Sequence, residues 1–456
     1  MEMNDTGSGF TIRLGRTSRK QFSYQDVERM NMKDYIFPYG SGTVTLSLEE
    51  TRVLGVLKGH DTPPLDDIGK GLYESLDAPV QSCSLRKWTS SGDKVALIIS
   101  DMSRFWMRQD LVIPHLIHYL NEECGIPDED ITILVANGTH VGGDEKELRT
   151  LVTSEIYDRI RVINHDCLAE DLVTIGVTSR GTTVRINKIA AMADRVIALG
   201  ACTHHVMAGY GGGRKSILPG ISAMDTICHN HAFALDPEVF RSNPLIGNSV
   251  TKGNPLNEDM CEAAALVPML FTINLVMNAD MKLCKIFSGD CQASWEAGCR
   301  AIDDIYRVNV KEKADVVIAS CGGYPKDMSL YQGTKTIDNI EPGLKTGGTL
   351  ILMIEARDGG GPAEYFDWLR PLEDGTFEEK LRNHFTVPGY IFLLNCEQAQ
   401  RYRIMMLTTV PEETLAVMGI EGYSDIRELM KQADLTDKTI YVIPNGATVI
   451  PCVEAD

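Results

Sequence analysis

The sequence predicts an α/β protein of two domains, each with a largely parallel sheet. Six short runs of Val, Ile, Leu and similar residues alternate with helical segments; they lie at residues 95–100, 131–136, 195–200, 315–320, 349–354 and 440–443. Continuous apolar runs of this length are typical of parallel strands that are buried on both faces. The 456 residues exceed what one hydrophobic core usually holds, so we expect two domains.

We expect a polar extension at residues 1–34, a first domain at 35–300 and a second at 301–456. The helical segment 292–307 is interpreted as the hinge, and the strand 440–443 could belong to either domain. Further elements expected in the first domain are a strand at 42–48 and helices at 68–77, 110–123 and 144–160.

Composition and charge exclude several classes of protein. A net charge of −19 argues against nucleic acid or an anionic membrane as partner. The twelve cysteines contain no C-x-x-C pair, which argues against a disulfide framework or a Cys-rich zinc site. Residues 1–20 lack the apolar core of a signal peptide, and no apolar run is long enough to span a membrane. These features predict a protein of the reducing cytoplasm.

Polar residues or a glycine turn follow several of the expected strands directly. The polar residues are Asp101 and Arg104, then Asn137 and His140, then His204 and His205, and the glycine turn is Gly322-Gly323. Ligands of open parallel sheets bind beyond the carboxyl ends of the strands. The coincidence therefore predicts a site that contains an acid, an arginine and histidines.

The densest segment is 203–231, which holds four of the ten histidines and a glycine-rich run. It is no P-loop, because Arg214 stands between Gly213 and Lys215, but its glycines leave a nucleotide-like ligand possible. Adjacent residues at a strand end point to opposite sides, so one of His204 and His205 is expected to be structural. The pair His229 and His231 is a weak zinc signal without a third ligand at fixed spacing.

The segment after residue 320 predicts a second polar cluster. Asp327 is a candidate N-cap for a helix that begins at Met328. On that helix Tyr331, Gln332 and Lys335 share one face. A hydroxyl, an amide and an ammonium suit a carboxylate ligand, although a solvated helix face is the alternative.

Two long motifs resemble the signatures of the nickel-pincer-dependent lactate racemases. The first comprises His205, Ala208-Gly209-Tyr210, Gly212-Gly213-Arg214-Lys215-Ser216, Leu218-Pro219-Gly220-Ile221 and Asn230-His231. The second comprises Gly322-Gly323-Tyr324-Pro325, Asp327, Tyr331-Gln332 and Lys335. The resemblance runs from about residue 35 to the C-terminus.

The resemblance implies two α/β domains with the active site in the cleft between them, and a nickel-bearing pyridinium mononucleotide, the nickel-pincer nucleotide. It implies that Lys215 attaches this cofactor covalently and that His231 binds the nickel. His140 and His205 would be the acid/base residues. The remaining roles implied are cofactor and substrate organisation by Asp101 and Arg104, and substrate binding by Tyr331, Gln332, Lys335 and Tyr390.

The implied reaction is inversion at C2 of a 2-hydroxy acid, in which the α-hydrogen passes as hydride to the cofactor and returns. Two histidines can alternate as base and acid near neutral pH. The implied partners are the small hydroxy acid and the enzymes that build the cofactor.

The chain departs from the family's usual pattern near the substrate. Phe105 follows Arg104 where the family has proline, and Val141-Gly142-Gly143 follows His140 where it has Arg-Pro. Tyr390 aligns near an active-site tryptophan. We therefore expect a substrate larger than lactate, such as a sugar acid. The rival interpretations are a zinc-type metallohydrolase that uses His229 and His231, and a non-catalytic protein that binds the nickel cofactor.

Overall fold

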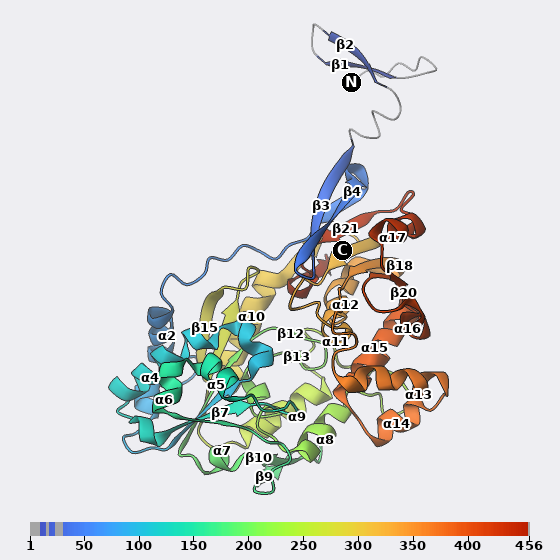
Figure 1. Cartoon of the computed structure of the whole chain (residues 1–456). Helices are drawn as coiled ribbons and strands as arrows, with labels where there is room; N and C mark the ends of the chain where they lie inside the picture. Colours follow the sequence, from blue (N-terminus) through green and yellow to red (C-terminus); the bar gives the residue numbers. More distant parts are fainter. Residues whose placement is uncertain (1–9, 15–17, 23–30, 455–456) are drawn as a thin grey trace. The chain divides into compact units, whose positions relative to one another are not determined.

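The computed structural model describes residues 10–14, 18–22 and 31–454, and it contains two compact α/β units (Figure 1). Unit 1 comprises residues 1–58, 308–373 and 395–456, and unit 2 comprises residues 59–307 and 374–394. Each unit has one six-stranded sheet that is wholly or mainly parallel. The expected α/β class with two parallel-rich sheets is confirmed.

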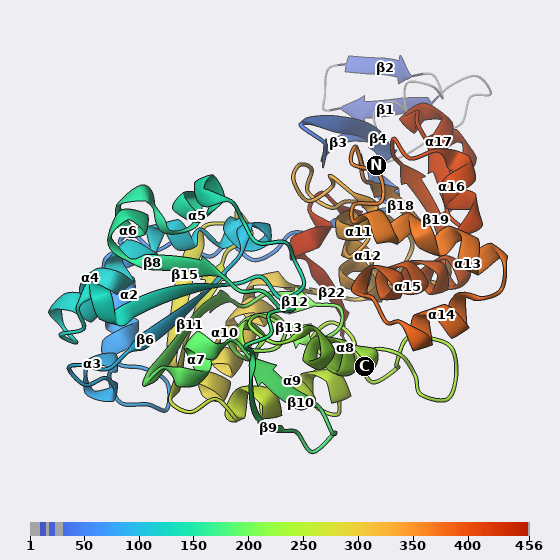
Figure 2. The same ribbon diagram turned by 60° about the horizontal axis from the view of Figure 1, so that its bottom comes forward.

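The sheet of unit 2 has the order β15-β14-β11-β6-β7-β8, and only β15 is antiparallel to its neighbour. Figure 2 labels β6, β8, β11 and β15 of this sheet. Its strands are β6 (Val95–Ser100), β7 (Ile131–Ala136), β8 (Arg161–Asn164), β11 (Arg195–Ala201), β14 (Leu270–Met277) and β15 (Leu283–Asp290). Two small pairs accompany it: β9 (Val173–Val177) with β10 (Thr183–Ile186), and β12 (His204–His205) with β13 (Gly209–Tyr210). Its helices are α2 (Ile68–Asp77), α3 (Leu85–Trp88), α4 (Ile113–Glu122), α5 (Glu145–Val152), α6 (Ser154–Arg159), α7 (Lys188–Met192), α8 (Met224–Ala232), α9 (Pro255–Ala265), α10 (Cys291–Tyr306) and α14 (Phe377–Asn383).

Helices cover both faces of this sheet. Alternate residues of β14, such as Phe271 and Ile273, join the core that α2 and α4 close. Between them, the amide of Asn274 donates to Ser294 of α10 on the opposite face at 3.1 Å. A sheet covered on both faces requires strands that are apolar throughout, which explains the continuous runs in the sequence.

The sheet of unit 1 has the order β20-β19-β18-β17-β21-β5 and is parallel throughout. Its strands are β5 (Val53–Val56), β17 (Ala314–Ser320), β18 (Leu344–Met353), β19 (Arg403–Leu407), β20 (Glu421–Tyr423) and β21 (Ile440–Ile443). Further strands of unit 1 are β1 (Phe10–Leu14), β2 (Ser18–Phe22), β3 (Met32–Tyr39), β4 (Gly42–Glu49) and β22 (Ile450–Val453). Strand β16 (Arg307–Val310) crosses the boundary between the units, because its first residue, Arg307, belongs to unit 2 and the others to unit 1. The helices are α11 (Leu330–Gly333), α12 (Thr336–Ile340), α13 (Leu369–Glu373), α16 (Glu412–Val417) and α17 (Ile426–Ala433); α15 (Val387–Arg401) runs from unit 2 into unit 1.

The chain divides between the units differently from the expected domains. Residues 35–58 join unit 1, because the hairpin β3–β4 packs on its core and β5 pairs with β21. Residues 374–394 join unit 2, where the rings of Phe377 and Phe240 lie 5.3 Å apart. The segment interpreted as the hinge, 292–307, corresponds to α10, which packs on β14 and β15, and the first segment of unit 2 ends directly after this helix, at Arg307.

Most individual elements agree with the expectation. All six apolar runs form strands, and the strand at 42–48 and the helix at 68–77 are present as β4 and α2. The helix expected at 144–160 is two helices, because Thr153 between them has a φ of +77°. Part of the extension 1–34 forms the antiparallel pair β1–β2, and residues 1–9, 15–17 and 23–30 lie outside the described part.

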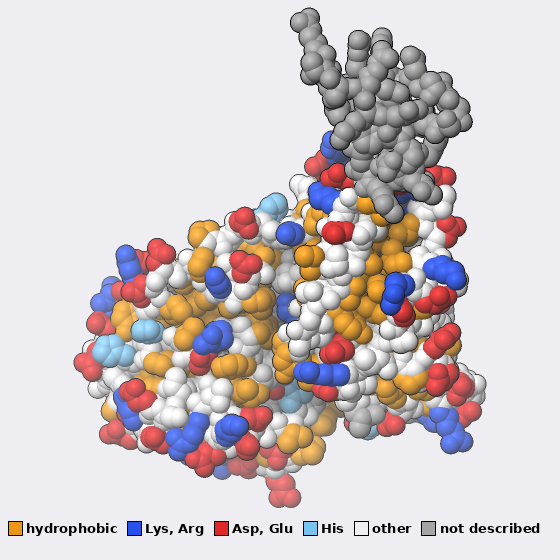
Figure 3. Space-filling model, turned by 45° about the horizontal axis from the view of Figure 1, so that its top comes forward, with side chains coloured by type: hydrophobic (Ala, Val, Ile, Leu, Met, Phe, Trp, Pro, Cys, Tyr) orange, Lys and Arg blue, Asp and Glu red, His pale blue; other side chains and the backbone are white. Residues whose placement is uncertain are grey.

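Two surface features bear on partners. In the described part of the chain, no helix has the length and apolar character that a membrane crossing requires. Acidic and basic side chains are interspersed on the face drawn in Figure 3.

Candidate active site

Asp101 and His140 form a pair at the carboxyl ends of the neighbouring strands β6 and β7. Oδ2 of Asp101 lies 2.6 Å from Nδ1 of His140, and the hydroxyl of Ser103 donates to Oδ1 at 2.6 Å. Arg104 follows on the same turn, where its guanidinium donates to Ser103. The two strands are parallel neighbours, which is why residues 39 positions apart meet here.

The charge of the Asp101 carboxylate determines which ring nitrogen of His140 carries the proton. Burial raises the pKa of Asp101, but the hydrogen bond and charge of His140, with Ser103 and Arg104, outweigh it and lower that pKa below its usual value. The carboxylate is therefore ionised at neutral pH and accepts the Nδ1–H of His140. The Nε2 lone pair remains on a side chain that is 51% exposed, which is the arrangement of a general base.

His204 and His205 lie on β12 and have different partners. Nε2 of His204 lies 2.8 Å from Asp303, and its ring packs near Tyr210 and Tyr306. His205 instead approaches Lys215: its Nε2 lies 2.7 Å from Nζ of that lysine. His204 thus has a structural setting, as expected for one of the two.

The glycine-rich run brings Lys215 to His205. The short helix η6 (Gly213–Ser216) starts after Gly212. Gly212 has a φ of +77°, and a Cβ atom at this position would lie only 2.9 Å from the side-chain oxygen of Asn274. Both features require glycine here. Gly213 donates its N–H to that same oxygen at 2.8 Å. The run is a tight turn docked on the sheet, and it fixes where the lysine side chain begins.

Arg214 anchors this turn, a role the sequence did not reveal. The side chain is buried, its guanidinium lies 3.8 Å from the Trp295 ring centroid, and it donates to Asn257 at 2.6 and 3.0 Å. It also donates to the carbonyl of Ala208 at 2.8 Å. In the sequence Arg214 appeared only as the residue that breaks the P-loop spacing, and the two side chains that hold it, Asn257 on α9 and Trp295 on α10, lie 43 or more positions away.

His231 lies on α8 and is buried. Its Nδ1 lies 3.0 Å from the carbonyl oxygen of Ile227, so Nδ1–H donates and Nε2 keeps its lone pair. Burial, with the charge of protonated Lys215, lowers the pKa of His231 to about 3. A ring that stays neutral with a free Nε2 is suited to bind a transition metal.

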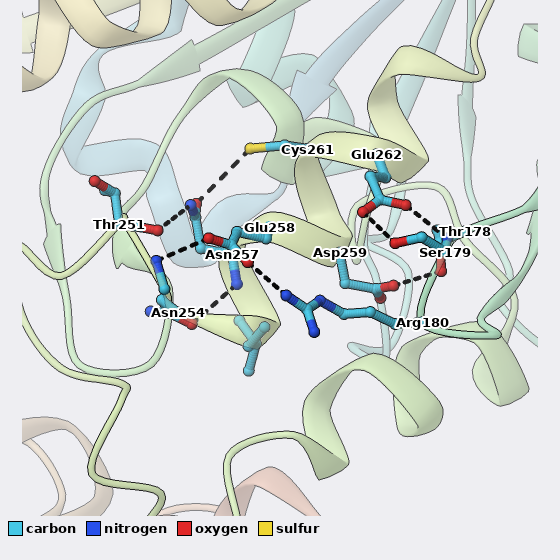
Figure 4. A network of polar contacts seen from close by, with 12 residues as sticks. Thr178, Ser179, Arg180, Thr251, Asn254, Asn257, Glu258, Asp259, Cys261 and Glu262 are labelled. Atoms are coloured by element: carbon cyan, nitrogen blue, oxygen red, sulfur yellow. Dashed lines mark hydrogen bonds and ion pairs between the residues drawn. The ribbon is translucent and has the colours of Figure 1, made fainter.

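Helix α8 is tied to α9 through a buried carboxylate, Asp259. The amide of Asn230 and the hydroxyls of Thr178 and Thr182 donate to it at distances of 2.6 to 3.0 Å. Figure 4 shows Asp259 and Thr178 beside the other contacts of α9, which include Glu262 with Ser179. This network holds the helix that carries His231.

His229 does not join His231 in a metal site. Its Nδ1 lies 2.8 Å from the Thr182 hydroxyl, and the two residues are two positions apart on a helix, so they point in different directions. Across residues 10–14, 18–22 and 31–454, no group of three or more His, Cys, Asp and Glu side chains is arranged to hold a metal ion. The zinc-hydrolase interpretation has no support in this geometry.

The substrate-binding candidates of unit 1 lie together. Nζ of Lys335 is 3.2 Å from the Gln332 side-chain oxygen and 3.9 Å from the Tyr331 ring centroid. The cap expected at Asp327 is wrong: α11 begins at Leu330, and the buried Asp327 carboxylate accepts the Gly40 amide at 2.5 Å. The cluster forms nevertheless, because Thr334 and Lys335 continue in helical conformation between α11 and α12.

Tyr390 lies on α15 in unit 2. It is 1% exposed, and its ring centroid lies 6.3 Å from that of Phe385. Its part in substrate binding stays a prediction.

A buried histidine near this site predicts how stability depends on pH. His165 is 2% exposed, its Nε2 lies 2.9 Å from the Ser222 carbonyl oxygen, and burial lowers its pKa. The unfolded ring takes a proton below about pH 6.5 while the folded ring resists it, so stability is lost as pH falls below about 6.5. We expect His165→Gln to lose less stability than the wild type between pH 7.5 and 5.5, measured by urea midpoints. Equal losses of stability in His165→Gln and the wild type would contradict this prediction. The control is His118→Gln, on the exposed face of α4, which should lose as much stability as the wild type.

The fold and these residues define a class: an α/β enzyme with a carboxylate–histidine pair, a histidine–lysine pair and a neutral buried histidine in one unit. The model of the lactate racemase N-terminal domain matches residues 39–241, and that of the lactate racemase C-terminal domain matches residues 309–451. The chain belongs to the lactate racemase family and is an isomerase.

Similar proteins span nearly the whole chain. The lactate racemase of Lactiplantibacillus plantarum is 32% identical over 429 residues, 91% of this chain and 98% of that protein. That of Thermoanaerobacterium thermosaccharolyticum is 28% identical over 437 residues, 92% and 99% of the two chains. The structure of the latter's apoprotein superimposes with a TM-score of 0.83 at 27% identity, covering 92% of this chain and all of that one. A Thermotoga maritima protein, 16% identical with a TM-score of 0.60 over 87% of this chain and all of that one, shares the fold.

Proposed function

We propose that this chain is a racemase or epimerase that inverts C2 of a 2-hydroxy acid with a nickel-pincer nucleotide bound at Lys215 and His231. The observation that carries the proposal is the pair of imidazoles with different proton positions. His140 carries its proton on Nδ1, which donates to Asp101, whereas Nδ1 of His205 accepts from the backbone N–H groups of Met207 and Ala208, which places its proton on Nε2. Inversion at a carbinol carbon needs a proton taken from the hydroxyl and returned to it. The Asp101–His140 pair is suited to remove the hydroxyl proton, and the Nε2–H of His205 is suited to return it.

The residues present fit the cofactor. His231 offers a neutral imidazole Nε2 to nickel, since its Nδ1–H is held by the Ile227 carbonyl. Lys215 offers an amine for covalent attachment, and the turn that carries it is fixed by Arg214. When bound, the cofactor supplies reversible two-electron chemistry at the substrate's C2, which side chains alone cannot supply.

The chain's own residues would orient the substrate and move its hydroxyl proton. Lys335, Gln332 and Tyr331 would bind the carboxylate through an ammonium, an amide and a hydroxyl. Arg104 and Asp101 would organise the substrate and cofactor next to His140, and Tyr390 is proposed to contact the substrate.

We propose a substrate larger than lactate. Val141 and Gly142 follow His140 where the family's usual pattern has Arg-Pro, and the Val141 side chain is 95% exposed. Phe105 and Trp106 pack against the core of unit 2. These changes leave the acid/base residues in place and remove a bulky cation from the region where a longer acid, such as a sugar acid, would extend.

Twelve free cysteines support the reducing cytoplasm as the place of action, and the maturation enzymes of the cofactor would be the protein partners. A small-molecule substrate fits the net charge of −19 better than nucleic acid or an anionic membrane surface does.

The test is a stereochemical assay of the loaded enzyme. Single enantiomers of 2-hydroxy acids from lactate to aldonic acids are incubated with the enzyme in deuterium-free buffer, and products are separated by chiral chromatography. We expect inversion at C2, fastest with an acid longer than lactate, and loss of inversion in His140→Gln and His205→Gln. Inversion that is best with lactate would contradict the larger substrate. Inversion that survives both substitutions would contradict the acid/base assignment.

A further inference from the structure

We propose that Asp303 is a positioning residue for His205, and that it acts through the hairpin β12–β13 that carries this histidine. The inference rests on the proposed function, in which His205 is an acid/base residue. Whether Asp303 sets the position of the His205 ring is a property of the chain without cofactor, so it can be tested separately.

Asp303 lies on α10 and joins this helix to the open end of the hairpin. Its Oδ1 lies 2.8 Å from Nε2 of His204 on β12, and the hydroxyl of Tyr210 on β13 donates to its Oδ2 at 2.8 Å. Arg307, directly after α10, forms an ion pair with the same carboxylate at 3.0 Å. Because His204 and Tyr210 lie directly opposite each other in the hairpin, one carboxylate fastens both strands to α10.

The charges strengthen this anchor. Burial raises the pKa of Asp303, but the hydrogen bonds from His204 and Tyr210, with the charge of Arg307, outweigh it and lower that pKa below its usual value. Burial lowers the pKa of His204, so the neutral ring donates its Nε2–H to an ionised carboxylate. The side chains of His204 and Tyr210 are each 5% exposed, so water cannot replace the carboxylate as their acceptor without opening this end of the hairpin.

The anchor decides which of two adjacent histidines reaches Lys215. Neighbouring side chains in a strand point to opposite faces. Since Asp303 holds His204 on the side of α10, His205 points away from that helix, and its Nε2 lies 2.7 Å from Nζ of Lys215. A slip of one residue would exchange the two histidines. The two side chains are identical, so a partner such as Asp303 is needed to fix the face of each.

The hairpin is too short to fix its own orientation. It has two cross-strand pairs, of which Asp303 holds the first while His205 belongs to the second. Even longer two-stranded hairpins are only marginally stable in water. Arg214 holds the turn at the carbonyl of Ala208, but the open end depends on α10. Nδ1 of His205 accepts from two turn amides at 3.2 Å each, the long end of the hydrogen-bond range, so a small rotation would weaken both bonds.

The first test is the activity of Asp303→Asn in the loaded enzyme. Asparagine has nearly the same shape, but it lacks the charge and leaves one acceptor oxygen for His204 and Tyr210. We expect kcat to fall by about 10- to 100-fold, as displacement of a reacting group by up to ~1 Å gives, with KM changed by less than about twofold. The control is Asp304→Asn at the next, exposed position of α10, which should keep the wild-type kcat.

The second test observes the His205 ring directly. The full-length chain with ¹⁵N-labelled histidines is made without maturation enzymes, and long-range ¹H–¹⁵N spectra show which ring nitrogens are protonated. We expect Nδ1 of His205 to be unprotonated in the wild type and in Asp304→Asn, and partly protonated in Asp303→Asn. The signals of His140, which Asp101 holds, should stay unchanged. A merely structural role of Asp303 would leave the His205 ring as it is in the folded chain.

The third test changes the other partner of the anchor. His204→Gln places an amide that can donate to Asp303 near the position of Nε2, whereas His204→Leu has no donor. We expect His204→Gln to have a kcat about tenfold or more above that of His204→Leu, the ratio to which one hydrogen bond to a charged group corresponds. This pair of variants also serves where Asp303→Asn does not fold.

Unchanged His205 ring signals in folded Asp303→Asn would overturn the inference, and so would a wild-type kcat in that variant or equal kcat in the two His204 variants. Each of these results leaves the proposed function standing, because the wild type still inverts its substrate. A loaded wild type that inverts no 2-hydroxy acid would contradict the proposed function. The ring spectra of the cofactor-free chain would then still decide whether Asp303 positions His205.

Discussion

Asp101→Asn is expected to lower kcat of the loaded enzyme by ~10²–10⁴-fold, the range that general acid–base catalysis contributes. The Asp101 carboxylate accepts the Nδ1–H of His140 at 2.6 Å and leaves Nε2 free to take a proton. An asparagine amide can donate to Nδ1 instead, which would move the ring proton to Nε2 and remove the base. The measurement is the initial rate of inversion of one enantiomer at pH 7, with nickel content measured on the same sample.

Ser103→Ala is the matched control for this prediction. It removes the other side-chain donor to Asp101, at 2.6 Å, and keeps the carboxylate. The loss of one such hydrogen bond corresponds to roughly fivefold, about 1 kcal/mol. Wild-type kcat in Asp101→Asn at full nickel occupancy would contradict the role of the pair, and equal effects of the two substitutions would indicate that only local order matters.

Asp259→Ala is expected to destabilise unit 2 by about 3 kcal/mol or more, because three buried donors lose their acceptor at about 1–3 kcal/mol each. These donors are the hydroxyls of Thr178 and Thr182 and the amide of Asn230. In a unit of this size the change corresponds to a melting temperature lower by about 6–12 °C. Differential scanning calorimetry of the full chain measures it, and nickel retention by the matured protein reports on His231.

The control is Glu262→Ala on the same helix. Glu262 accepts from Ser179 at the surface, so its loss should cost less than about 1 kcal/mol. If Asp259→Ala has the melting temperature of the wild type, the buried network does not hold α8. If both variants melt at similarly lowered temperatures, the cause is a general weakening of helix α9, and the Asp259 carboxylate has no specific role.

The strands and the strand-end residues could be predicted because both are local in the sequence. A buried parallel strand is a continuous apolar run, and the residue after it is at the ligand-binding edge of the sheet. Asp101 and His140 were found in this way, and the structure joins them at 2.6 Å.

The rest depended on contacts between distant segments. β5 belongs to the sheet of unit 1 because it pairs with β21, almost the whole chain away, and nothing in its four residues indicates this. Asp327 has the residue type and position of a helix cap, but its carboxylate accepts a hydrogen bond from the backbone N–H of Gly40 instead. No local sequence pattern indicates the anchoring role of Arg214 either, because that role depends on its contacts with Asn257 and Trp295, which are distant in the sequence.

The most direct test of the central claim is intact mass and nickel content of the chain co-expressed with the cofactor's maturation enzymes. The account predicts a cofactor-sized adduct on Lys215 and nickel near one per chain. It also predicts that Lys215→Arg lacks the adduct, and that His231→Ala keeps the adduct but loses nickel. An unmodified Lys215 without nickel, in cells where a lactate racemase expressed in parallel is found to be modified, would contradict the account.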